Sequence, residues 1–147
     1  MSYSEDEILL KKILNQIINS TGGIKYAIII DDTGITIMNK AKFIIDDDIT
    51  VEKIGAIAGA VYTAGEEQGQ ILGYGRIGLQ MTEYDKGLIF SVKVGQGVLC
   101  LTTDLKIQIG MVRSVLKKWA PKIGQILDRY LKVDQDTINQ ELKELFF

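Results

Sequence analysis

Small residues inside a strongly helical stretch constrain this chain more than any other feature. The segment TVEKIGAIAGAVYTAGEEQG, residues 50–69, is predicted to form one helix with two packing faces. At about 100° per residue, one broad arc collects apolar side chains suited to a sheet, namely Val51, Ile54, Ile57, Ala58, Val61 and Tyr62. The far side collects Gly55, Ala56, Gly59 and Thr63, flanked by Glu52 and Glu66.

The two glycines on the far side of this helix indicate that it has a second packing face. Glycine in a helix costs about 1 kcal/mol relative to alanine, and a water-facing surface would favour long charged residues instead. Gly55 and Gly59 stand four residues apart on that side, which indicates that another helix backbone approaches closely. The alternative is a poorly optimised surface. The first interpretation predicts that the helix packs against its counterpart in a homodimer.

The segment that follows, ILGYGRIGLQMTEY at residues 71–84, is predicted to be one long strand. Gly75, Ile77, Leu79 and Met81 would form its apolar face. Residues 73–78 match the G-x-G-x-x-G dinucleotide pattern letter for letter. That fingerprint needs a strand before it and a helix after it, so that the phosphates meet a helix N-terminus. Here a helix precedes the pattern and a strand follows, and we expect no nucleotide cofactor.

The rest of the chain alternates short strands and helices. Residues 4–19 are predicted to be a first helix and residues 105–131 a long last one, and the other strands are expected at 24–30, 35–39, 88–94 and 98–103. The order is therefore helix, two strands, helix, three strands, helix, which is an α+β fold. Strands joined by such short turns pair antiparallel.

The last helix and the tail raise two further expectations. The polar face of the helix is basic, which predicts either a solvated surface or contact with an acidic partner; its members are Lys106, Arg113, Lys117, Lys118, Lys122, Arg129 and Lys132. Pro121 predicts a kink. Residues 134–136 are predicted to be a linker, so that the chain divides into a domain at 1–132 and an extension at 133–147. That extension carries a short amphipathic helix that needs a surface to dock on.

Composition excludes several classes of function. The chain has no histidine, which rules out Ser-His-Asp and Cys-His catalysis and the usual zinc ligand sets. Asp46, Asp47 and Asp48 lack the spacing of a calcium loop, so no metal site is expected. Cys100 lies in an apolar run and is expected to be buried and inert. We predict a protein that is not an enzyme.

Charge and hydropathy bear on partners and location. The net charge of −2 favours neither nucleic acid nor anionic lipid, and we expect no nucleic-acid partner. No apolar run approaches the roughly 20 residues of a membrane span, so direct membrane insertion is not expected. The acidic N-terminus lacks the pattern of a signal peptide, and the predicted location is the cytoplasm.

Taken together, GGIKYAIIIDDTGITI, the small-residue helix IGAIAGAVYTAGEE and the long last helix resemble the Roadblock/dynein light chain family. The resemblance covers roughly residues 5–131. It implies a five-stranded antiparallel sheet in the order 2-1-5-4-3, with the second helix on one face and the first and last on the other. It also implies a dimer in which the third strands pair edge to edge and the second helices pack antiparallel.

The resemblance gives the chain an expected function as well. Family members bind and regulate Ras-like small GTPases, and some stimulate GTP hydrolysis, so the expected function is a homodimeric regulator or scaffold for such a GTPase. The expected dimer interface comprises Gly55, Ala56, Gly59, Thr63, Tyr74, Arg76 and Gln80. Candidates for contact with the GTPase are Glu52, Glu66 and Glu67. The alternatives are a structural adaptor, such as a motor or membrane-complex light chain, and a small-ligand sensor.

Overall fold

The computed structural model describes residues 3–43 and 48–146, with the side chains of 3, 4, 48, 49, 133 and 134 left out of the description. Of the three acids in the loop before the second helix, Asp46 and Asp47 lie outside the described residues. Within them, no helix is long and apolar enough to cross a membrane. Nor do three His, Cys, Asp or Glu side chains gather there as a metal site would require.

A five-stranded antiparallel sheet forms the centre of the molecule, in the order β2-β1-β5-β4-β3. This order and the element sequence confirm the expected fold. The strands are β1 (Ile24–Ile30), β2 (Thr36–Ala41), β3 (Gln80–Tyr84), β4 (Gly87–Val94) and β5 (Gly97–Asp104). Within the described part of the chain, β3 pairs only with β4 and therefore forms one edge of the sheet.

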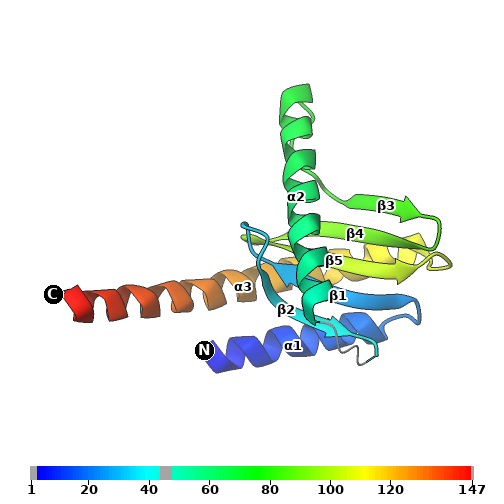
Figure 1. Cartoon of the computed structure of the whole chain (residues 1–147). Coiled ribbons are helices and arrows are strands. Elements are labelled where there is room, and N and C mark those ends of the chain that lie inside the picture. Colours follow the sequence, from blue (N-terminus) through cyan, green and yellow to red (C-terminus); the bar gives the residue numbers. More distant parts are fainter. Residues whose placement is uncertain (1–2, 44–47, 147) are drawn as a thin grey trace.

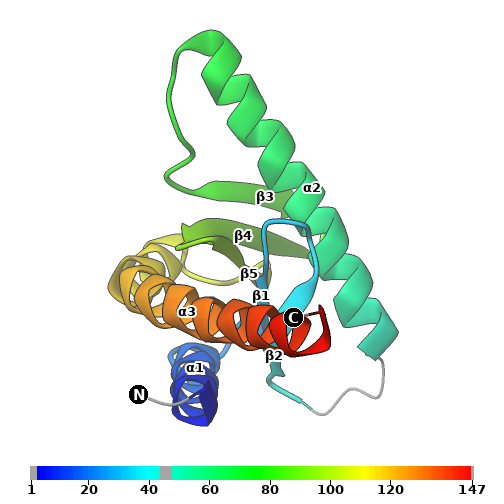
Figure 2. The ribbon, with the colours of Figure 1, turned by 90° about the vertical axis from the view of Figure 1, so that its left-hand side faces the viewer.

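Three helices cover the two faces of the sheet (Figures 1 and 2). They are α1 (Tyr3–Asn19), α2 (Asp48–Leu72) and α3 (Ile109–Phe146). α1 and α3 lie side by side on one face and enclose the larger core, which includes Leu14, Phe90 and Ile123. α2 crosses the other face above a smaller core that includes Ile28 and Cys100. Burial on both faces explains why β1 is apolar at nearly every position.

The third strand is much shorter than the sequence predicts. α2 continues to Leu72, and the strand begins only at Gln80. Gly73 and Gly75 have φ angles of 70° and 86°, which a strand does not allow. The amides of Gly73 and Tyr74 donate to the carbonyls of Gln70 and Gly69, at 3.2 and 2.8 Å. This is a Schellman ending, so the G-x-G-x-x-G pattern begins at a helix C-terminus and has no helix N-terminus to offer a phosphate.

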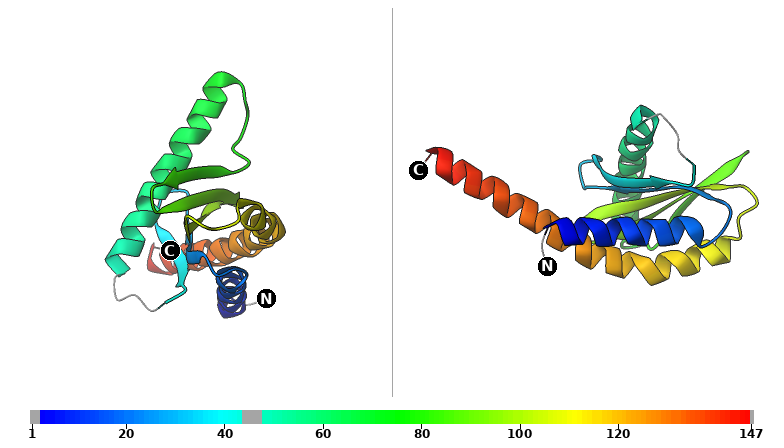
Figure 3. Two further views of the ribbon diagram at one scale, coloured as in Figure 1. Left: turned by 90° about the vertical axis from the view of Figure 1, so that its right-hand side faces the viewer. Right: turned by 90° about the horizontal axis from the view of Figure 1, so that it is seen from below.

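The prediction of a linker at residues 134–136 is wrong. α3 runs without interruption from Ile109 to Phe146, through Pro121 and through the supposed linker. Its last turns project away from the sheet as a free arm (Figure 3). Residues 135–146 are exposed throughout, so no part of the arm docks on its own domain.

Candidate functional site

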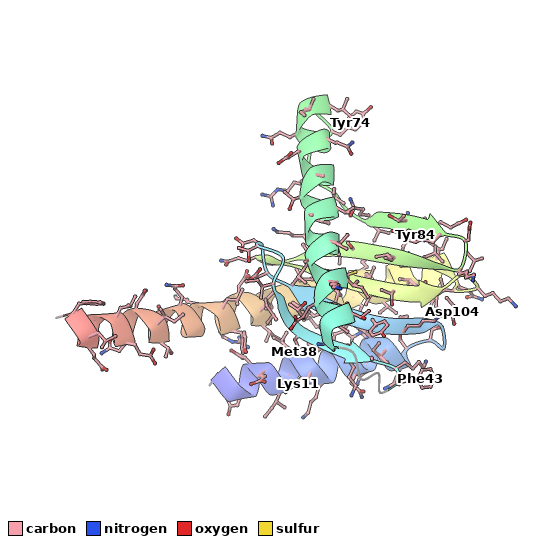
Figure 4. The ribbon with its side chains drawn as sticks, viewed as in Figure 1. Lys11, Met38, Phe43, Tyr74, Tyr84 and Asp104 are labelled. Atoms are coloured by element: carbon pink, nitrogen blue, oxygen red, sulfur yellow. The ribbon has the colours of Figure 1, made fainter. Side chains whose placement is uncertain are left out.

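The edge strand β3 and the nearby face of α2 form an open apolar surface on the α2 side of the sheet. A groove of about 230 Å³ runs between them. α2 contributes Ile54, Ile57, Ala58 and Val61, and the strands contribute Gln80, Thr82, Tyr84, Ile89 and Ser91. Ile57 is 64% exposed, Val61 47% and Tyr84 54%. Figure 4 shows Tyr84 on β3, at one side of α2.

The assignment of the two faces of α2 from sequence needs correction. Val51, Ala58 and Tyr62 are buried against the sheet as expected, but Ile57 and Val61 point to solvent. Conversely, Gly55 is buried, although the sequence pattern places it on the side that faces away from the sheet. The helix is therefore rotated on the sheet relative to the prediction. The reason is that a helix lies closest to its support along its smallest side chains.

Gly55 and Gly59 of α2 approach the chain's own β1–β2 hairpin. A Cβ added at Gly55 would lie 2.6 Å from Thr36 Oγ1, and one added at Gly59 would lie 3.1 Å from Gly34 Cα. The prediction that another helix backbone approaches these glycines is therefore wrong, because side chains of Thr36 and Ile30 and the backbone of Gly34 in the chain's own hairpin already lie there. For this reason Gly55→Leu or Gly59→Leu would disturb the fold before it could report on a dimer.

The segment between α2 and β3 is held against the helix. The amide of Ile77 donates to Glu66 Oε2 at 3.1 Å, and Gln80 Nε2 donates to the carbonyl of Val61 at 3.4 Å. A Cβ at Gly69 would lie 2.5 Å from the carbonyl oxygen of Gly75. Ile77 packs into the core under α2 and Leu79 into the opposite core, so they do not share the face that the sequence predicts. Glu66 has a structural role here.

The far end of α2 stands clear of the sheet. Its last turns rise beyond β3, and Tyr74 lies at their tip (Figures 1 and 4). The apolar side chains there, Ile71, Leu72 and Tyr74, are all exposed. Of the other predicted interface residues, Ala56, Thr63 and Arg76 are exposed and Gln80 is half-buried. Glu52 and Glu67 are exposed on the same helix.

Two titratable groups lie beneath this face. Burial raises the pKa of the Tyr62 hydroxyl to about 12, with a further contribution from the carboxylate of Glu66. Burial also raises the pKa of the Cys100 thiol to about 11. Both groups are neutral near pH 7, and a neutral thiol is a poor nucleophile. Tyr62 and Cys100 therefore serve the packing beneath α2, and the face above them suits association with another chain.

The structure also joins a pair of residues that the sequence does not connect. Asp6 of α1 is fully buried and accepts hydrogen bonds from Arg129 of α3, with Nη2 at 2.8 Å and Nε at 3.0 Å. The hydrogen bonds from Arg129 hold the pKa of Asp6 below its usual range despite its burial. No local pattern signals this pair, because its members stand 123 residues apart.

Comparison with known proteins gives relatives of uncharacterised role. Two proteins of Methanocaldococcus jannaschii, "Uncharacterized protein MJ0310" and "Uncharacterized protein MJ1340", are each 30% identical over 118 residues. Each alignment covers 80% of this chain and 95% of the relative. The chain belongs to the family of these two archaeal proteins. No protein-family model matches the chain.

Comparison with solved structures shows the fold. "MglB with tetrameric arrangement" has a TM-score of 0.77 at 17% identity, covering 85% of this chain and 92% of that one. The gliding protein mglB from Thermus thermophilus has a TM-score of 0.75 at 17% identity, covering 88% and 93%. A Roadblock/LC7 domain from Streptomyces avermitilis scores 0.65 at 15% identity, covering 76% and 95%. The resemblance seen in the sequence is thus confirmed for the fold.

Proposed function

We propose that this member of the MJ0310 family is a homodimeric scaffold or regulator for a Ras-like small GTPase. Two chains join through β3 and the exposed face of α2, and the joined surface receives the GTPase. The observation that carries the proposal is the apolar groove between Ile57, Val61 and Tyr84 beside an unpaired strand edge, on a Roadblock/LC7 fold. An unpaired edge next to exposed apolar side chains favours association with another chain.

A two-fold pairing of β3 accounts for several features together. Antiparallel pairing of β3 with its copy would extend the sheet across both chains and satisfy the open backbone groups of the edge. The two α2 helices would then lie on the same face of the joined sheet. The projecting end of each, with Ile71, Leu72 and Tyr74, would reach toward the second chain.

The contact set predicted from sequence changes under this proposal. Ile57, Val61 and Tyr84 become its apolar centre, and Ala56, Thr63, Tyr74, Arg76 and Gln80 stay as candidates nearer its border. Gly55 and Gly59 no longer belong to the proposed dimer interface, because the β1–β2 hairpin already occupies the space beside them. Glu52 and Glu67 remain candidates for contact with the GTPase, since both are exposed on α2.

Val61→Arg tests the dimer. The substitution places a charge in the middle of the groove, and we expect it to weaken this association at least tenfold, because an unpaired charge is costly in an apolar interface. The measurement is sedimentation equilibrium with the fold checked by circular dichroism. Ile8→Arg is the matched control, since Ile8 is 51% exposed but lies on α1 at the other face of the sheet. An unchanged mass for folded Val61→Arg would refute the interface.

Binding assays and rates of GTP hydrolysis test the proposed interaction with a GTPase. Ras-like GTPases of the same cell, loaded with GTP, should bind the wild-type chain and the Ile8→Arg control equally. They should bind Val61→Arg at least tenfold more weakly, because the receiving surface needs both chains. Hydrolysis with and without the wild-type chain then separates a stimulator from a passive scaffold. The GTPase proposal fails if none of these GTPases binds.

A further inference from the structure

A second groove lies on the opposite face of the molecule, along α3. It has a volume of about 460 Å³ and is lined by Ile77, Gly78, Leu79, Val92, Lys93, Arg113, Leu116, Lys117, Ala120 and Pro121. A shallower depression of about 350 Å³ shares Lys93, Ala120 and Pro121 and continues along the helix to Asp128. The two together make an elongated trough beside one face of α3.

The trough has an apolar floor and a basic border. Among the described residues, its first part is lined by three cationic residues, Lys93, Arg113 and Lys117, and by no acidic one. Further along, Asp128 accepts a hydrogen bond from the amide of Gln96 at 2.8 Å, so its carboxylate serves the β4–β5 turn. The shape and charge suit an amphipathic helix with acidic flanks.

The projecting arm of α3 has this composition. Residues 135–146 carry three acids, Asp136, Glu141 and Glu144, and one base, Lys143, for a net charge of −2. Four of its apolar side chains are exposed, namely Ile138, Leu142, Leu145 and Phe146. Leu142 is 47% exposed and Phe146 74%, and nothing in the described chain covers them.

The apolar stripe of the arm and the trough lie on one side of the same helix. Five helical turns span about 18 residues, so positions 18 apart project in the same direction. Ala120 thereby aligns with Ile138, and Gly124 with Leu142. On this side of α3, the residues beside the sheet are small and border the trough, whereas the residues of the arm are large, apolar and exposed.

The arm cannot reach the trough of its own chain. Lys117 and Leu142 belong to one continuous helix and stand about 37 Å apart at 1.5 Å per residue. A second copy placed antiparallel along this face fits the requirement. The arm of the second copy then covers the trough of the first copy, and the trough of the second copy receives the arm of the first. The two-fold axis passes near residue 130. Each copy gives its arm and receives the arm of the other, so two chains complete the contact, as a stable two-fold interface requires.

We infer that the arm of α3, residues 135–146, docks in the α3 trough of a second copy of this chain, as a second two-fold interface. It lies on the face of the sheet opposite to the α2 surface. A chain with both interfaces joins dimers into tetramers or larger assemblies. The GTPase-receiving surface, which rests on the proposed function, would then be displayed more than once per assembly, which raises avidity for a clustered partner.

Leu142→Glu in a Val61→Arg background tests this contact alone. With the α2 interface weakened, we expect Val61→Arg to remain a dimer through α3 and the double variant to be a monomer, with at least a tenfold weaker association. Met111→Glu is the matched control, because Met111 is 45% exposed on α3 but projects away from the trough. Sedimentation equilibrium gives the masses, and circular dichroism verifies the helix content.

Lys117→Glu tests the trough side of the same contact. It should weaken the α3 association by a similar factor. Lys118→Glu should not, because Lys118 is rotated by about 100° around the helix and does not line the trough. A monomeric Val61→Arg chain at 100 μM, on the order of the concentration where weak dimers form, would overturn the inference. If Leu142→Glu lowers the mass of the wild-type assembly and Val61→Arg does not, the α2 dimer fails and the α3 contact stands.

Discussion

Gly55 leaves no space for a methyl group between α2 and the β1–β2 hairpin. An added Cβ would lie 2.6 Å from Thr36 Oγ1 and 2.9 Å from Ile30 Cγ2. The spacing of glycines in the sequence predicts that another helix backbone approaches α2 closely, whereas the neighbours of Gly55 are side chains of Thr36 and Ile30. A periodic pattern within one helix cannot identify the neighbour, because it carries no information about the elements around the helix.

Gly55→Ala should therefore destabilise the protein. Overpacking costs about 1–3 kcal/mol and exceeds the gain of up to about 1 kcal/mol in helix propensity. Urea unfolding measures the difference. Gly110→Ala is the control, because nothing lies within 4 Å of the added Cβ and propensity alone should act there. A Gly55→Ala protein as stable as the wild type would contradict the packing assigned to this face.

At the scale of elements, the first helix and the strands other than β3 follow closely from the sequence. β1 spans the predicted residues, and β4 and β5 differ by one residue at one or both ends. These elements are apolar, short and bounded by glycine turns. The prediction of the third strand fails because it counts Gly73 and Gly75 as strand residues, although glycine after a long helix more often ends that helix. The prediction of the linker fails because Asp134, Gln135 and Asp136 tolerate either a helix or a linker.

The contact between α1 and α3 depends on Asp6 and Arg129. The direction in which pH changes the stability that this pair contributes can be predicted. Arg129 depresses the pKa of Asp6 in the folded chain, so the pair stabilises the fold above the unfolded pKa of about 4. That stability is lost as the pH falls through the lower, folded value. Asp31, whose burial is outweighed by hydrogen bonds from Thr33 and Ile35, has a lowered pKa and adds to the same acid loss.

Arg129→Gln should reverse the contribution of Asp6. Without the guanidinium, burial alone raises the pKa of this carboxyl, so the variant should be clearly less stable than the wild type near neutral pH and closer to it near pH 4. Thermal unfolding between pH 7 and pH 4 measures the trend. The assignment is wrong if the difference between variant and wild type stays constant over that range.

At the scale of the whole molecule, the sheet separates two surfaces with different characters. The α2 side offers an apolar groove and a strand edge, and the α3 side offers a basic trough and an acidic arm. The fold could be predicted from the sequence, but the exposure of Ile57 and Val61 on α2 could not, because their helical spacing places them on the arc expected to face the sheet. The trough could not, because Ile77, Lys93 and Lys117 come from three separate segments that only the fold brings together.

Spin labels on β3 test the central claim, the edge-to-edge pairing of two chains, most directly. A single label at Glu83→Cys is selective, since Cys100 is buried and its thiol neutral. In an antiparallel β3 pair, the five residues of each strand keep the two labelled positions within roughly 30 Å. Double electron–electron resonance should therefore report a distance below that value in the wild-type background and lose it in Val61→Arg. Distances only beyond about 40 Å would contradict the pairing.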